Sequence, residues 1–260
     1  LKQRILTAIV AAALVLVALW APTPWPWWIL AVVVSGLAGS ELARLLQSPA
    51  LTLVAPLAVG ALVFRSEELP EGVFRAGISI LALVWIACIA LLALRMRVAN
   101  STERLIFGGV YLSVPLGLLA WAISLDLPGA WKAPLLVLLP LWAGDTAAIF
   151  AGRAFGRRPL APEISPKKTV EGSLANLAAC VGIALAVGTA CGLGWMSSVG
   201  IGLATGILGQ AGDLFESALK RQAGAKDSGG LLPGHGGVLD RIDSLLFAAP
   251  VVIWILAASA

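Results

Sequence analysis

The sequence predicts an all-α integral membrane protein with about nine transmembrane helices. Of its 260 residues, 59% are hydrophobic and only 12% are charged, whereas a soluble globular domain carries roughly 25% charged residues. Apolar runs of about 20 residues, the length that crosses a hydrocarbon core of ~30 Å, recur along the whole chain. The same composition excludes a disordered protein, because disordered chains are poor in apolar residues.

The predicted spans follow one another with mostly short connections. In chain order they are 5–21, 27–46, 51–64, 73–94, 105–125, 133–152, 174–194, 198–219 and 242–258. The first follows Lys2 and Arg4, and no small-residue cleavage site leads from it into a soluble domain, so we interpret it as a span and not as a signal peptide. The third is short, and we expect it to be tilted, re-entrant or supported by its neighbours.

The distribution of basic residues predicts the orientation. If there are nine spans, the N-terminus and the segments after spans two, four, six and eight share one side, and that side carries 15 of the 18 Lys and Arg residues. The positive-inside rule then places the N-terminus in the cytoplasm and the C-terminus outside. We expect a multi-pass protein of the cell's inner membrane, whose net charge of +4 reflects cytoplasmic loops and anionic lipid headgroups, with no nucleic-acid partner.

The chain divides into two regions. Residues 1–130 are spans with plain connections, whereas residues 131–260 carry two long cytoplasmic loops, 153–173 and 220–241, rich in Gly, Pro and basic residues. We expect the chemistry in these loops. The three cysteines lie inside apolar runs without metal-ligand spacing, and we interpret them as small core residues.

Acidic residues inside three predicted spans point to a functional site. Asp145 lies in span six, Asp213 and Glu216 share a face of span eight, and Asp240 and Asp243 open span nine. An ionisable side chain within a span costs at least ~2.5–3.5 kcal/mol at mid-depth, so its default interpretation is functional. We expect all five carboxylates near the cytoplasmic end of the membrane.

A structural role is the alternative for any one of these acids. Asp240 or Asp243 could simply pair with Arg241, but acids from three spans at similar depth favour a functional cluster. In the second span, Glu41 and Arg44 form an i, i+3 pair near the inner boundary, which we interpret as structural.

The residue types around the acids predict a magnesium and phosphate site. Clustered carboxylates suit Mg²⁺, and zinc is disfavoured because neither a Cys nor a second His accompanies His235. Basic residues stand close by in the sequence: Lys167, Lys168, Lys220, Arg221 and Lys226. The turn PGHGG at 233–237 adds backbone N–H groups that can approach phosphate oxygens, from Gly234, Gly236 and Gly237.

The segment from Ser217, SALKRQAGAKDSGGLLPGHGGVLDRID, closely resembles the signature of the phosphatidate cytidylyltransferase (CDP-diacylglycerol synthase) family. The matching positions are Ser217, Lys220, Arg221, Lys226, Asp227, His235, Gly236, Gly237, Asp240, Arg241 and Asp243. The segments GDTAAIFAGRAFGRRPLAPEISPKKTVEGS and GDLFES look like upstream blocks of the same family. The resemblance is specific over about 144–245; before that it rests on hydropathy.

The resemblance implies a Mg²⁺-dependent enzyme of phospholipid biosynthesis that transfers the cytidylyl group of CTP to phosphatidic acid, releasing pyrophosphate. A monovalent cation such as K⁺ and a homodimer are compatible with it. It implies Asp213 and Asp240 as metal ligands, with Asp145 as a further candidate. The candidate catalytic residues are Asp213, Asp240, Asp243 and Lys226. The candidate substrate-binding residues are Ser165, Lys167, Lys168, Lys220, Arg221, His235, Gly236, Gly237 and Arg241.

Two other functions remain open from the residues alone. A CTP-dependent lipid kinase would transfer the γ-phosphate and release CDP. A cation-coupled transporter would use the intramembrane acids, but its acids belong at mid-membrane on broken helices. The lipid phosphate is already largely dianionic at neutral pH, so cytidylyl transfer needs no protein nucleophile. This suits a chain with a single histidine.

Overall fold

The computed structural model describes residues 2–64, 77–87, 89, 101–123, 133–232 and 236–259, and over these it is almost entirely helical. Its labelled helices are α1 (Lys2–Leu19), α2 (Trp25–Leu46), α3 (Leu51–Phe64), α5 (Ser101–Ala122), α6 (Ala133–Phe155), α7 (Val170–Ala190), α8 (Trp195–Gln222) and α9 (Leu239–Ala258). A further short apolar helix covers Gly77–Ala87. Two strands, β1 (Pro159–Ala161) and β2 (Ser165–Thr169), connect α6 to α7.

The helices follow the predicted spans closely. The bounds of α3 coincide with the predicted span 51–64, and the other labelled helices differ from their spans by four residues or fewer at each end. The predicted span 73–94 lies partly outside the described residues. Within the described part of the chain, five helices are long and apolar enough to cross a membrane: α2, α5, α6, α7 and α9. The 28-residue α8 is more polar, because its second half carries the sequence GQAGDLFESALKR.

The predicted loop 153–173 contains a short β-hairpin that the all-α prediction did not include. Pro159 pairs with Thr169 and Ala161 with Ser165 in an antiparallel ladder. Two strands of three and five residues are marginal by themselves. Their stability depends on the adjacent helix ends.

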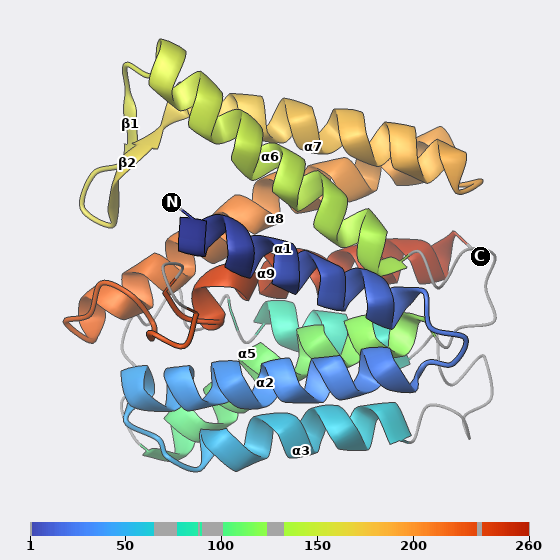
Figure 1. Cartoon of the computed structure of the whole chain (residues 1–260), viewed down its shortest axis with the longest axis vertical. Coiled ribbons are helices and arrows are strands. Elements are labelled where there is room, and N and C mark those ends of the chain that lie inside the picture. The colour runs from blue at the N-terminus through green and yellow to red at the C-terminus, as the bar shows by residue number, and fades with distance from the viewer. Residues whose placement is uncertain are drawn as a thin grey trace.

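Because successive helices run in opposite directions, the polar connections lie at one end of the bundle. In Figure 1 the N-terminus, the connection from α2 to α3, the β-hairpin and the segment between α8 and α9 all lie at the left, and the C-terminus lies at the right. This is the arrangement that the alternation of spans requires. The membrane side that this end faces remains a prediction.

Helix packing brings the two halves of the chain together. The helices α6, α7 and α8 pack consecutively, as do α2, α3 and α5, while α9 contacts both α8 and α5. Aromatic rings pack at this junction. The ring centroid of Tyr111 in α5 lies 5.7 Å from that of Phe215 in α8, which lies 5.3 Å from that of Phe247 in α9. Such ring pairs add stability beyond their buried area. These ring contacts help to set the position of α9 relative to α8, and with it the position of their polar ends.

Two tryptophans fasten α2 to α5 at the opposite end. The indole N–H of Trp27 donates to the Leu119 carbonyl and that of Trp28 to the Ala120 carbonyl, each at 3.1 Å. Both side chains are buried. The position of α2 is therefore determined by direct bonds as well as by apolar packing.

Candidate functional site

The β-hairpin carries a lysine onto α8. Thr169 caps α7, since its hydroxyl accepts the Gly172 N–H at 3.1 Å, as expected for a helix N-cap. The Glu171 carboxylate accepts the backbone N–H groups of Arg157 and Arg158 at 3.1 and 3.3 Å, which ties the start of the hairpin to the start of α7. Between these anchors, Lys168 Nζ lies 2.5 Å from Asp213 Oδ2.

Asp213 is the more open of the two candidate metal-binding aspartates. Its side chain is 35% exposed, and besides Lys168 it accepts a long hydrogen bond of 3.4 Å from the Ser217 hydroxyl, one turn further along α8. One face of the carboxylate therefore remains accessible.

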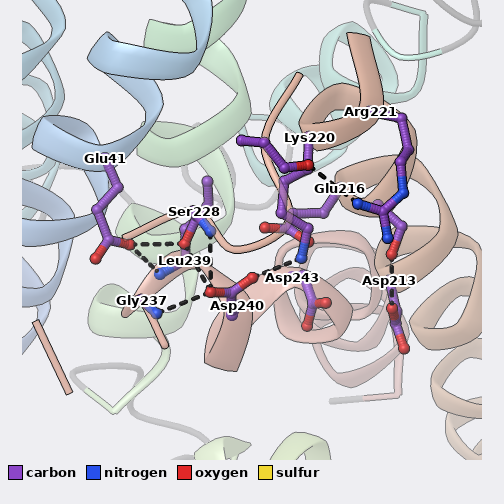
Figure 2. Close-up of polar contacts among 12 residues, drawn as sticks. Glu41, Asp213, Glu216, Lys220, Arg221, Ser228, Gly237, Leu239, Asp240 and Asp243 are labelled. Atoms are coloured by element: carbon purple, nitrogen blue, oxygen red, sulfur yellow. Dashed lines mark hydrogen bonds and ion pairs between the residues drawn. The ribbon is translucent and has the colours of Figure 1, made fainter. Parts of the chain in front are cut away.

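Asp240, by contrast, is surrounded by donors. Lys220 Nζ lies 2.5 Å from Oδ1, while Oδ2 accepts from Gly237 N at 2.8 Å, Ser228 N at 3.1 Å and the Ser228 hydroxyl at 3.0 Å. Figure 2 shows these contacts converging on Asp240 from the signature segment and from α8. The carboxylate organises the turn that leads into α9.

Lys220 joins two acids. Its ammonium contacts both Asp240 and the wholly buried Glu216, which lies one turn earlier on α8. Buried charges are tolerated only when they are paired. Lys220 therefore acts as the internal counter-ion of this part of the site, and Lys168 plays the same role for Asp213.

The remaining acids of the cluster lie on α9 and α6. Buried Asp243 lies in electrostatic range of Asp213 and Glu216, and its Oδ1 accepts the Ser244 N–H at 2.7 Å. Asp145 lies in electrostatic range of Asp213 and accepts a 3.4 Å bond from the Asn176 amide. Acids from α6, α8 and α9 thus gather at the same end of the bundle.

The helices approach closely where these acids meet. A Cβ built on Gly212 would stand 2.5 Å from the Asp243 carbonyl oxygen, so any side chain there would separate α8 from α9. Asp213 is the next residue on α8. Gly212 therefore lets the aspartates of the two helices approach each other.

The other predicted residues occupy varied places. Lys167, Lys226 and Arg241 are exposed, with no ion pair among the described residues. The guanidinium of Arg221 donates to the Ala225 carbonyl at 3.0 Å. Ser165 is partly buried in β2. His235 lies outside the described residues.

The two glycines of the signature differ in role. Gly236 has a φ of +84°, a conformation that favours glycine. Gly237 was predicted to offer its N–H to phosphate, but that N–H donates to Asp240 and the residue is buried. In this structure its amide therefore donates to the aspartate.

Glu41 has other partners than the sequence predicted. Its side chain is fully buried, and its oxygens accept from the Ser228 hydroxyl at 3.0 Å, Val238 N at 3.1 Å and Leu239 N at 2.8 Å. Arg44, the predicted partner, is exposed. Two features could have indicated that Glu41 has a distant partner. One is its position as an acid in an apolar span, and the other is the signature segment, whose buried N–H groups need acceptors.

The donor set fits a hard cation, although no site is ready-made. Within the described residues no three acidic, histidine or cysteine side chains are grouped as a metal site. The available donors are carboxylate oxygens, which Mg²⁺ prefers. The cluster contains more acids than paired lysines. The acids are Asp145, Asp213, Glu216, Asp240 and Asp243, and the lysines paired with them are Lys168 and Lys220. The excess of acids over paired lysines favours a divalent cation at this place.

Comparison with known proteins establishes the family. Residues 2–259 match the model of the cytidylyltransferase family. A phosphatidate cytidylyltransferase of Bacillus subtilis is 35% identical over 271 aligned positions, which cover 99% of this chain and 98% of that protein. The chain belongs to the cytidylyltransferase family.

Other relatives of this cytidylyltransferase match over a shorter stretch. A phosphatidate cytidylyltransferase of Synechocystis is 45% identical over 141 positions, or 52% of this chain and 46% of that protein. A chloroplastic one of Arabidopsis thaliana is 43% identical over 136 positions, or 49% of this chain and 33% of that protein. The resemblance noted over residues 144–245 is confirmed, and the Bacillus subtilis relative extends it through the N-terminal helices.

Proposed function

We propose that this cytidylyltransferase carries out the reaction for which its relatives are named, the transfer of the cytidylyl group of CTP to phosphatidate. An oxygen of the lipid phosphate attacks the α-phosphorus of CTP, the bond from that phosphorus to the β-phosphate oxygen breaks, and pyrophosphate leaves. The products are CDP-diacylglycerol and pyrophosphate. The main support is family membership over the full length, together with acids and exposed cations gathered at one end of the bundle.

The exposed cations suit the binding of two anionic substrates. Lys167 on the hairpin, Lys226 in the signature segment and Arg241 at the start of α9 project from three different elements. We assign them to the phosphates of CTP and of the lipid, which would otherwise repel each other. Lys168 and Lys220 already have aspartate partners, so their role is to orient these carboxylates.

Asp213 and Asp240 are the residues that would hold Mg²⁺, with Asp145 and Asp243 beside them. When bound, Mg²⁺ polarises the α-phosphoryl group and offsets the charge of the leaving pyrophosphate. Asp213 suits this role by its exposure, and Asp240 by the donors that fix its orientation. No protein group needs to accept a proton, because the attacking phosphate is already dianionic.

The reaction requires a site at a membrane surface, since the lipid tails stay in the bilayer while CTP is dissolved in water. We propose that the end bearing the hairpin and the signature segment faces the cytoplasm. The excess of Lys and Arg at that end supports this orientation.

Labelled CTP distinguishes the candidate reactions. Purified protein in detergent, given phosphatidate and Mg²⁺, is expected to move the label of [α-³²P]CTP into lipid and that of [γ-³²P]CTP into pyrophosphate. A lipid kinase would do the reverse, with γ-label in lipid and α-label in CDP. Transfer of γ-label to lipid, or no transfer of either label by folded protein, would refute the proposed function.

A further inference from the structure

The carboxylate of Glu41 connects the N-terminal helices to the signature segment. Glu41 lies in the last two turns of α2, yet its three hydrogen-bond donors lie 187 to 198 residues further along the chain. Figure 2 shows its side chain reaching from α2 toward Ser228 and Leu239. The carboxylate is fully buried, and these donors are what make its burial tolerable.

Glu41 supplies the cap that α9 lacks. The first N–H groups of a helix have no partner within the helix, and the N-cap residue Val238 has a side chain that cannot accept a hydrogen bond. The Glu41 oxygens accept from Val238 N and Leu239 N instead. A negative charge at this end also interacts favourably with the helix dipole. The start of α9, where Asp240 and Asp243 lie, is thus held by a residue of α2.

A serine carries the connection to Asp240. The Ser228 hydroxyl lies 3.0 Å from Glu41 Oε2 and 3.0 Å from Asp240 Oδ2, so the two carboxylates share its single O–H proton. The space between them is tight, because a Cβ on Gly237 would overlap both the Ser228 hydroxyl and the Glu41 carboxylate. A movement of Glu41 would therefore move Ser228, the Gly237 turn and Asp240 together.

We propose that Glu41 is a positioning residue of the active site, which fixes Asp240 through Ser228 and through the N-terminus of α9. This role rests on the proposed function, and it also assigns a task to the N-terminal helices. Glu41 touches no phosphate in this scheme. Its loss should therefore reduce turnover and leave substrate affinity nearly unchanged.

The test compares Glu41→Gln, Ser228→Ala and Trp28→Phe in the full-length protein in detergent. Whichever way the amide introduced by Glu41→Gln turns, its NH₂ faces the Val238 or the Leu239 N–H, whereas Ser228→Ala removes only the bridging hydroxyl. Trp28→Phe is the matched control on α2, since it loses one buried bond to Ala120 at the opposite end of that helix. The readouts are kcat and KM for CTP per folded molecule, with hydrogen exchange over residues 236–243.

We expect Glu41→Gln to lower kcat at least tenfold and Ser228→Ala at least threefold, each with KM for CTP within threefold of the wild type. Exchange over 236–243 should rise in Glu41→Gln, and Trp28→Phe should keep the wild-type kcat. Wild-type kcat in folded Glu41→Gln, or in Ser228→Ala should Glu41→Gln fail to fold, overturns the proposal. An inactive wild-type protein would instead overturn the proposed function.

Discussion

The two aspartates proposed as metal ligands should respond differently to the same substitution. Besides the Ser228 hydroxyl, Asp240 has three hydrogen-bond partners that can only donate: Lys220, Gly237 N and Ser228 N. In Asp240→Asn, the amide NH₂ must face at least one of them in either orientation. An unsatisfied buried donor costs ~1–3 kcal/mol. We therefore expect a loss of stability of about 2 kcal/mol, which lowers Tm by roughly 4–8 °C.

Asp213→Asn should reduce turnover strongly but stability only slightly. The side chain is 35% exposed, and its partners are Lys168 and a weak bond from Ser217. Partly exposed ion pairs contribute ~0–1 kcal/mol, so Tm should fall by only a few degrees. Both substitutions remove a proposed metal ligand, and each should reduce kcat by about a thousandfold or more, equivalent to ~4 kcal/mol of the barrier.

The assay pairs turnover with thermal unfolding. Transfer of α-label from CTP to lipid gives kcat, and tryptophan fluorescence of the ten Trp residues gives Tm. Near-normal turnover in either variant would remove that aspartate from the metal site. Equal losses of Tm in the two variants would refute the inference that Asp240 organises the turn while Asp213 stays open.

Three further predictions use the same assays. Gly237→Ala should lower both Tm and kcat, the latter at least tenfold, because its Cβ would overlap Ser228 and Glu41; Gly230→Ala, with open space around it, should change neither. Thr169→Ala removes the cap of α7 and should cost about 1 kcal/mol, whereas Thr169→Ser should keep most of that stability. EDTA should abolish turnover, with Mg²⁺ restoring it and Zn²⁺ failing to, and activity without any divalent ion would contradict the metal assignment.

The helices were predictable because a membrane leaves few choices. A spanning segment must satisfy its own backbone bonds, so hydropathy alone located α3 at its observed bounds and α6 from its first residue. The hairpin was missed since its strands lie in a loop rich in Pro and basic residues, and their pairing depends on Glu171 and Thr169 at the start of α7.

The site was predictable in its composition but less so in its connections. Intramembrane acids are costly, which singled out the acids of spans six, eight and nine before any geometry was known. The choice of Asp213 and Asp240 among them came from the family resemblance. The ion-pair partners of these acids could not be predicted from the sequence, because Lys168 and Lys220 were equally plausible as phosphate ligands. Glu41 was misread because Arg44 offered a nearby partner, and no periodicity links position 41 to residues 228–239.

The distance in sequence between Glu41 and its donors has a consequence for biosynthesis. Ribosomes add about 5–20 residues per second, so α2 is made roughly 10–40 s before the 197 residues to Val238 have followed. During that interval an acidic side chain sits in the last turns of an apolar helix without its eventual partners. Only when the signature segment and the start of α9 have been made does that carboxylate obtain all three of its donors, so this part of the site cannot form while α2 is still waiting for them.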